Sequence, residues 1–225
     1  FMKKIFKNIV IGFTLLFIII TLFGTYFYIT ASNYKDYPIK GDTNIFQKIG
    51  IEENYDTLSN YLISQMTLDE KIDQLSGEKK FSGWIKFIVN YAVNGVFPHV
   101  YVGENERLKI PPLVGSDGPR GARVIKKESE GVTTFPVAIA RGASWDINLE
   151  KRVNEAIAIE MRANGTNYAF TPCINLLRHP GWGRAQETYG EDPWLLGEFG
   201  VAATKSYKKH NVMACPKHYA LNSIE

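Results

Sequence analysis

A long apolar segment near the N-terminus dominates the pattern of hydrophobic and polar positions. Ile9 to Ile29 contains no charged residue and is rich in Ile, Leu and Phe. A helix rises about 1.5 Å per residue, so about 20 apolar residues span the roughly 30 Å hydrocarbon core of a bilayer. We therefore predict a transmembrane signal-anchor helix over residues 9–29.

The flanks of this segment predict its orientation. Residues 1–8 are basic, and the positive-inside rule places them in the cytoplasm. Residues 30–50 are polar and indicate a linker to a folded part outside the cell membrane, which makes the protein single-pass. The competing interpretation is a signal peptide cleaved near Ser32, which gives a secreted protein. The apolar run exceeds the length of about 7–15 residues that is usual for signal peptides, and this favours the anchor.

Two short helices are predicted directly after the linker. The first covers residues 54–65, and the second starts at Thr67, where Thr67 and Glu70 have the spacing of a capping box. Ile72 and Leu75, three residues apart, predict an apolar face on the second helix.

Periodicity changes along the remaining chain. Residues 77–107 show no clear period and predict a long loop with one short helix. Beyond Ile110, short apolar runs alternate with amphipathic stretches, and runs too short for helices are typical of buried parallel strands. The predicted strands are 112–115, 137–140, 168–171 and 212–215.

Two amphipathic helices are predicted between the last three strands. The first begins after Asp146 as N-cap and ends at Gly165. The second begins after Asp192, with Pro193 at its first position. Apolar residues line one face of each helix. They are Leu149, Val153, Ile157 and Met161 in the first, and Leu196, Phe199, Ala203 and Tyr207 in the second. The predicted order is βαβαβ.

This alternation predicts either an open doubly wound sheet or a closed (β/α)8 barrel. The chain lacks the Gly-x-Gly-x-x-Gly turn of a dinucleotide-binding sheet. Its long polar loop after the third strand is typical of the active-site face of a barrel. A complete barrel takes about 250 residues, more than remain beyond the linker. We therefore predict an α/β fold, an incomplete TIM-type barrel over residues 51–225, and expect the chain to be a fragment.

Composition narrows the possible partners. The chain is 45% hydrophobic and 22% charged, as in globular proteins. Its net charge of +3, from 26 basic and 23 acidic residues, argues against nucleic acid as a partner. The chain has only two cysteines, Cys173 and Cys215, which do not indicate a disulfide framework. We interpret them as small buried apolar residues.

Polar clusters follow three of the predicted strands. In residues 115–121 the carboxylate of Asp117 lies between glycines, where it can accept hydrogen bonds from sugar hydroxyls or close an Asx-turn. Residues 178–192 suit either a loop folded over a polar ligand or an internal network of charges. Those charges are Arg178, Arg184, Glu187 and Glu191. Lys217 and His218, after the last strand, are adjacent donors that either meet one ligand or form a solvated surface pair.

These clusters, in their order and spacing, resemble the N-terminal barrel of glycoside hydrolase family 3. The resemblance begins near Leu58, continues to the last residue and excludes the apolar segment. The matching segments are 115–121, 133–136, 142–146, 187–193 and 217–222.

The resemblance implies a retaining, exo-acting β-glycosidase without a metal ion or an organic cofactor. It implies that four residues bind the hydroxyls of the cleaved sugar: Asp117, Arg184, Lys217 and His218. Retaining hydrolysis needs a nucleophilic carboxylate and an acid/base about 5 Å apart. The family places both beyond Glu225, so we expect no catalytic residue in this chain and no activity from it alone. The oligomeric state stays open.

The chain departs from the family pattern at two positions. The family usually has Arg-Asp-Pro-Arg-Trp-Gly-Arg, whereas residues 178–184 are Arg-His-Pro-Gly-Trp-Gly-Arg. His179 and Gly181 thus replace an acidic and a basic residue of the family pattern. If those two residues form an ion pair in the family, the two replacements compensate for each other. The departure motivates an alternative, a catalytically inactive membrane-tethered carbohydrate-binding protein. Residues 217–222 lack the second histidine of the β-N-acetylglucosaminidases, which favours a β-glucosidase or β-xylosidase.

Overall fold

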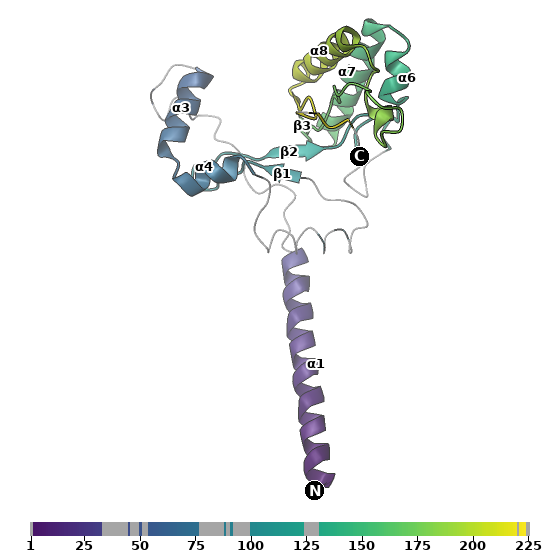
Figure 1. Ribbon diagram of the computed structural model, residues 1–225. Helices are drawn as coiled ribbons and strands as arrows, with labels where there is room; N and C mark the ends of the chain where they lie inside the picture. Colours follow the sequence, from purple (N-terminus) through teal and green to yellow (C-terminus); the bar gives the residue numbers. More distant parts are fainter. Residues whose placement is uncertain are drawn as a thin grey trace. The chain divides into compact units, whose positions relative to one another are not determined.

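The structure is a computed structural model that describes residues 2–32, 45, 50, 54–76, 88, 91, 100–123, 131–219 and 221–223. Most of the predicted linker, residues 30–50, and most of residues 77–99 lie outside the described residues. The chain divides into two compact units (Figure 1). One contains helix α1, and the other contains the four strands with helices α3, α4, α6, α7 and α8.

Helix α1 (Met2–Ser32) contains the predicted apolar segment. Its stretch Phe6–Ile29 has 24 residues, a mean hydropathy of 2.3 and no burial within the protein. Three threonine hydroxyls, those of Thr14, Thr21 and Thr25, each donate to the carbonyl four residues earlier at 2.8 Å. This helix has the length and composition of a membrane span, and a signal sequence near an N-terminus has the same properties.

Helices α3 (Tyr55–Gln65) and α4 (Leu68–Gln74) confirm the predicted pair. At the start of α4 the backbone N–H of Thr67 donates to Glu70 at 2.8 Å, and the N–H of Glu70 donates to the Thr67 hydroxyl at 3.2 Å. The predicted apolar face is exposed, because no described residue covers it: Ile72 is 44% exposed and Leu75 is 89% exposed.

The four short strands form one sheet in the order β1-β2-β3-β4. They are β1 (Val100–Val102), β2 (Leu113–Ser116), β3 (Tyr168–Ala169) and β4 (Met213–Ala214). The last three are parallel, as predicted. Strand β1 lies where the sequence predicted a loop. Antiparallel pairing with β2 forms this three-residue strand, which is too short to show a hydrophobic period of its own.

Helices α7 (Ile147–Ala163) and α8 (Pro193–Lys209) connect the parallel strands and pack against each other (Figure 1). Asp146 caps α7 by accepting from the Leu149 N–H at 2.9 Å, and Asp192 caps α8 by accepting from the Leu195 N–H at 2.7 Å. The predicted apolar faces form much of the core, and Ile157, Met161, Phe199 and Tyr207 are fully buried. The structure thus has a βαβαβ order, but its first strand is β2 and not the predicted strand 137–140.

The predicted strand at 137–140 is wrong, because these residues enter helix α6 (Ala138–Gly142). Its buried residues, Ala138, Arg141 and Gly142, recur at the i, i+3, i+4 spacing of a helix. The inward position of Arg141 decides the conformation, since its guanidinium pairs with a buried carboxylate on α7. A short apolar run does not reveal that partner.

Candidate functional site

Asp117 follows β2 directly and lies at the surface. Its side chain is 61% exposed, and its Oδ2 is 3.6 Å from Nη1 of Arg123. The loop itself is anchored at Gly121, whose φ is +150° and where a Cβ would lie 2.1 Å from the carbonyl oxygen of Thr133. Only glycine fits this close approach. The loop is therefore fixed against residue 133, and the carboxylate of Asp117 forms an ion pair on its exposed side.

A buried ion pair ties this loop to the helices. The Arg141 Nε donates to Glu150 Oε2 at 2.7 Å, and both side chains are almost completely buried. The Arg141 Nη1 also donates to the carbonyl oxygens of Pro119, at 3.0 Å, and Pro136, at 2.6 Å. The hydroxyl of Tyr189 donates to Glu150 Oε1 at 2.8 Å. One carboxylate thus fixes α6, α7 and the loop that contains Tyr189.

The protonation of this network follows from its surroundings. Burial, with the nearby charge of Glu150, raises the pKa of Tyr189 well above its ordinary value. Burial acts to lower the pKa of Arg141, but the hydrogen bond and charge of Glu150 outweigh it, and the net shift is upward. Tyr189 therefore remains a neutral donor and Arg141 a cation.

Arg184 and Glu187 form a two-point ion pair at the short 3₁₀ helix η1 (Ala185–Glu187). The Arg184 Nε and Nη2 donate to the two carboxylate oxygens at 2.8 and 2.7 Å. This hydrogen bonding lowers the pKa of Glu187, and the charges of Lys217 and His218 lower it further. Part of the predicted charge network thus exists, while Arg178 and Glu191 are exposed.

The two departures from the family pattern contact each other in a closed turn. The Gly181 N–H donates to Nδ1 of His179 at 3.0 Å, and the Trp182 N–H donates to the His179 carbonyl at 3.1 Å. Trp182 itself is buried. The histidine therefore closes the turn through its ring nitrogen, and the loop packs onto the protein through Trp182.

Lys217 and His218 extend β4 beside the end of β3. The Lys217 N–H donates to the Pro172 carbonyl at 2.9 Å, and the Ile174 N–H donates to the Lys217 carbonyl at 2.7 Å. The peptide bond between Lys217 and His218 is cis. Both residues are partly buried, unlike a solvated surface pair.

Asn175 belongs to the same group of residues, and the sequence interpretation missed it. Its Oδ1 accepts from the His218 backbone N–H at 2.7 Å and lies 2.9 Å from the Nδ1 of that ring. Its Nδ2 donates to the His218 carbonyl at 3.3 Å, and its own carbonyl accepts from the Thr188 hydroxyl. The signal was available, because Asn175 is a polar residue in an apolar run just beyond a predicted strand.

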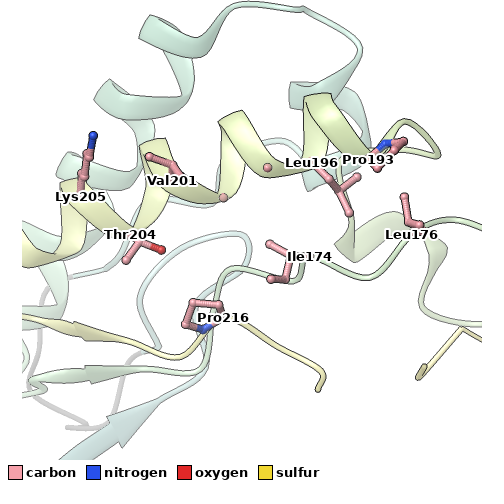
Figure 2. A pocket seen from close by; sticks show the side chains of 10 residues that line it. Ile174, Leu176, Pro193, Leu196, Val201, Thr204, Lys205 and Pro216 are labelled. Atoms are coloured by element: carbon pink, nitrogen blue, oxygen red, sulfur yellow. The ribbon is translucent and has the colours of Figure 1, made fainter. Parts of the chain in front are cut away.

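A cavity of about 650 Å³ lies between α8 and the chain beyond β3 and β4 (Figure 2). Ile174 and Pro216 line it from the strand side (Figure 2). Neighbouring residues of an extended chain point to opposite faces. Asn175 and Lys217 therefore face away from α8, toward the side that forms the interior of a TIM-type barrel.

The chain beyond β3 links three of the four predicted binding residues. Cys173 pairs in parallel with both Lys217 and Thr188, the residue after the Arg184–Glu187 pair, and Asn175 bonds to His218. Asp117 instead pairs with Arg123. Both cysteines are free, and burial raises the pKa of the Cys173 thiol. Cys173 is therefore the small buried residue that the sequence predicted, whereas Cys215 is only partly buried.

Comparisons with known proteins identify the family to which this chain is similar. The model of the glycosyl hydrolase family 3 N-terminal domain matches residues 67–222. Beta-glucosidase B of Emericella nidulans is 34% identical over 73% of this chain and 17% of its own length. A beta-xylosidase of Formosa agariphila is 28% identical over 78% of this chain and 22% of its own. The chain therefore spans about a fifth of the length of these relatives.

A solved structure shares the fold. Beta-glucosidase 3B from Thermotoga neapolitana in complex with glucose aligns with a TM-score of 0.60 and 30% identity, over 74% of this chain and 23% of that one. The described α/β unit is accordingly TIM-barrel-like.

Proposed function

The chain belongs to glycosyl hydrolase family 3, and on that premise we propose that it is part of a retaining, exo-acting β-glycosidase that hydrolyses oligosaccharides or glycosides. Residues 51–225 supply part of the N-terminal barrel and of the binding site for the cleaved sugar. The names of the relatives support a β-glucosidase or a β-xylosidase.

The observation that carries this proposal is that Cys173 and Asn175, in the chain beyond β3, link Lys217 and His218 to Thr188, the residue after the Arg184–Glu187 ion pair. Arg184 and Lys217 provide donors for sugar hydroxyls, His218 provides an imidazole nitrogen, and Asp117 provides an acceptor at the neighbouring strand end. Hydrogen bonds to a pyranose strengthen as its ring flattens toward an oxocarbenium ion. These residues would therefore bind the transition state more strongly than the substrate.

We further propose that the catalytic carboxylates lie outside this chain. A general acid needs a raised pKa, whereas the pKa of Glu187 is lowered by its hydrogen bonds from Arg184. Glu150 is fully buried and accepts hydrogen bonds from Arg141, Asn154 and Tyr189. Both carboxylates have structural partners that explain their positions.

Steady-state hydrolysis of aryl β-glucosides and β-xylosides tests the proposal. The protein from its complete reading frame is expected to hydrolyse one of them with retention of anomeric configuration, observed by NMR of the first product. Residues 51–225 alone are expected to give no turnover above the uncatalysed rate. Turnover by this segment would contradict our location of the catalytic groups. Sugar binding without turnover by the complete protein would favour the inactive carbohydrate-binding alternative.

We also propose that α1 anchors the protein in the cell membrane, with residues 1–8 cytoplasmic and the barrel outside. The length and hydropathy of Phe6–Ile29 support this location. The native protein is expected in the membrane fraction, released by detergent but not by high salt, with its N-terminal residues intact. A secreted protein that begins near Ser32 would show instead that the segment is a cleaved signal peptide.

A further inference from the structure

Asn175 directs both polar atoms of its side chain toward His218, and its amide oxygen also accepts from the Cys173 thiol at 3.6 Å. Its amide oxygen accepts from the His218 backbone N–H at 2.7 Å, its amide nitrogen donates to the His218 carbonyl at 3.3 Å, and the ring Nδ1 lies 2.9 Å from the same oxygen. The side chain is buried at the end of β3. Both the oxygen and the nitrogen of the amide thus contact His218.

The contacts of Asn175 indicate which ring nitrogen of His218 carries a hydrogen. A backbone N–H only donates and a carbonyl only accepts, so the two backbone contacts fix which end of the Asn175 amide is oxygen. That oxygen can only accept, and Nδ1 of His218 must therefore carry a hydrogen. In the neutral ring the hydrogen is then absent from Nε2, which is the acceptor nitrogen.

The main chain of Asn175 has a separate role. Its carbonyl accepts from the hydroxyl of Thr188, directly beyond the 3₁₀ helix that contains Glu187. The backbone of Asn175 thus holds the Arg184–Glu187 half of the polar group, and the side chain holds the Lys217–His218 half. A substitution of the side chain addresses only the second of these connections.

We propose that Asn175 is a positioning residue that holds the His218 imidazole in one orientation and in the Nδ1–H tautomer. A ligand hydroxyl that meets Nε2 of the neutral ring then donates its hydrogen to His218, while Lys217 beside it donates. The pair thus offers a sugar one acceptor and one donor. This inference rests on the proposed sugar-binding role of His218, but the tautomer is a property of the protein itself.

The first test measures the tautomer without substrate. In the complete protein labelled with ¹⁵N-histidine, the ring nitrogen shifts of His218 at about pH 8, where an ordinary imidazole is neutral, are expected to report hydrogen on Nδ1. His218→Ala identifies the signal. Asn175→Asp, which keeps the acceptor oxygen, is expected to retain this tautomer, and Asn175→Leu to lose it. Hydrogen on Nε2 in the unsubstituted protein would overturn the proposal, whatever the enzymatic activity.

The second test is a double-mutant cycle on kcat/KM. Asn175→Leu is expected to lower kcat/KM on the order of tenfold, as the loss of a buried hydrogen bond does, but to have almost no effect when His218 is already alanine. The control is Asn164→Leu, which removes another side-chain amide, bonded at 2.9 Å to the Glu160 carbonyl at the end of α7. It should leave kcat/KM and the His218 tautomer unchanged.

An equal loss of kcat/KM in both backgrounds would overturn the proposal, because Asn175 would then act independently of His218. If Asn175→Leu does not fold, the His218 tautomers in the unsubstituted protein and in Asn175→Asp still test the proposal. A protein with the Nδ1–H tautomer but no glycosidase activity would contradict the proposed function and leave the positioning role of Asn175 intact.

Discussion

Glu150→Ala is expected to lower the free energy of unfolding of the barrel domain by about 3–5 kcal/mol, the usual cost of breaking a buried ion pair from one side. The substitution leaves the buried guanidinium of Arg141 without its carboxylate partner. It also removes the acceptor of the Tyr189 hydroxyl and one of the two acceptors of the Asn154 amide. Urea denaturation of the complete protein, with hydrogen exchange of the peptides that cover α7, measures the loss.

The surface pair between Lys209 and Glu155 provides a matched control on the same helices. Its N–O distance is 2.9 Å, and both side chains are partly exposed. Exposed pairs contribute less than about 1 kcal/mol, so Glu155→Ala should have a small effect. Equal effects of Glu150→Ala and Glu155→Ala would show that the network around Arg141 does not hold the domain together.

Lys217→Ala and His218→Ala, made separately in the complete protein, are expected to lower kcat/KM on the order of a hundredfold. That factor corresponds to about 3 kcal/mol, the typical loss when a polar group that binds mainly the transition state is removed. Lys217 faces away from α8, and the ring of His218 lies beside Asn175, so we expect both side chains to contact ligand and not core. Steady-state kinetics and thermal melting of each variant measure the two properties separately.

Asp117→Ala is expected to lower kcat/KM in the same direction, because it removes the carboxylate that we propose accepts hydrogen bonds from the sugar hydroxyls. Arg123→Ala tests whether the ion pair or the carboxylate of Asp117 is important. If Asp117 contacts the sugar, Arg123→Ala should lower kcat/KM less than Asp117→Ala does. Lys205→Ala, at the cavity beside α8 (Figure 2), removes a charge away from the proposed site and should leave the kinetics unchanged. Unchanged kinetics of the alanine variants of Lys217, His218 and Asp117 would show that these residues do not bind the sugar. A loss of the folded state would indicate a structural role.

Elements with local signals could be predicted from the amino-acid sequence. Asp146 and Asp192 cap their helices because an N-cap needs only a side chain within three residues of the N–H that it accepts from. The buried faces of α7 and α8 follow the helical period and required no knowledge of their partners. Asp117, Lys217 and His218 could be singled out because polar residues just beyond apolar runs mark strand ends in a parallel α/β fold, whereas their proposed binding role came from the family resemblance.

Only the tertiary structure decided the features that depend on distant residues. Residues 138–142 form a helix because Arg141 pairs with Glu150, and β1 forms because β2 lies beside it. Asn175 holds His218 across 43 positions of sequence. Burial and hydrogen bonding act through space, and a side chain's nearest partner in space is often far away in the sequence. The sequence therefore determined which residues are polar at the strand ends, and the structure decided which of them hold one another.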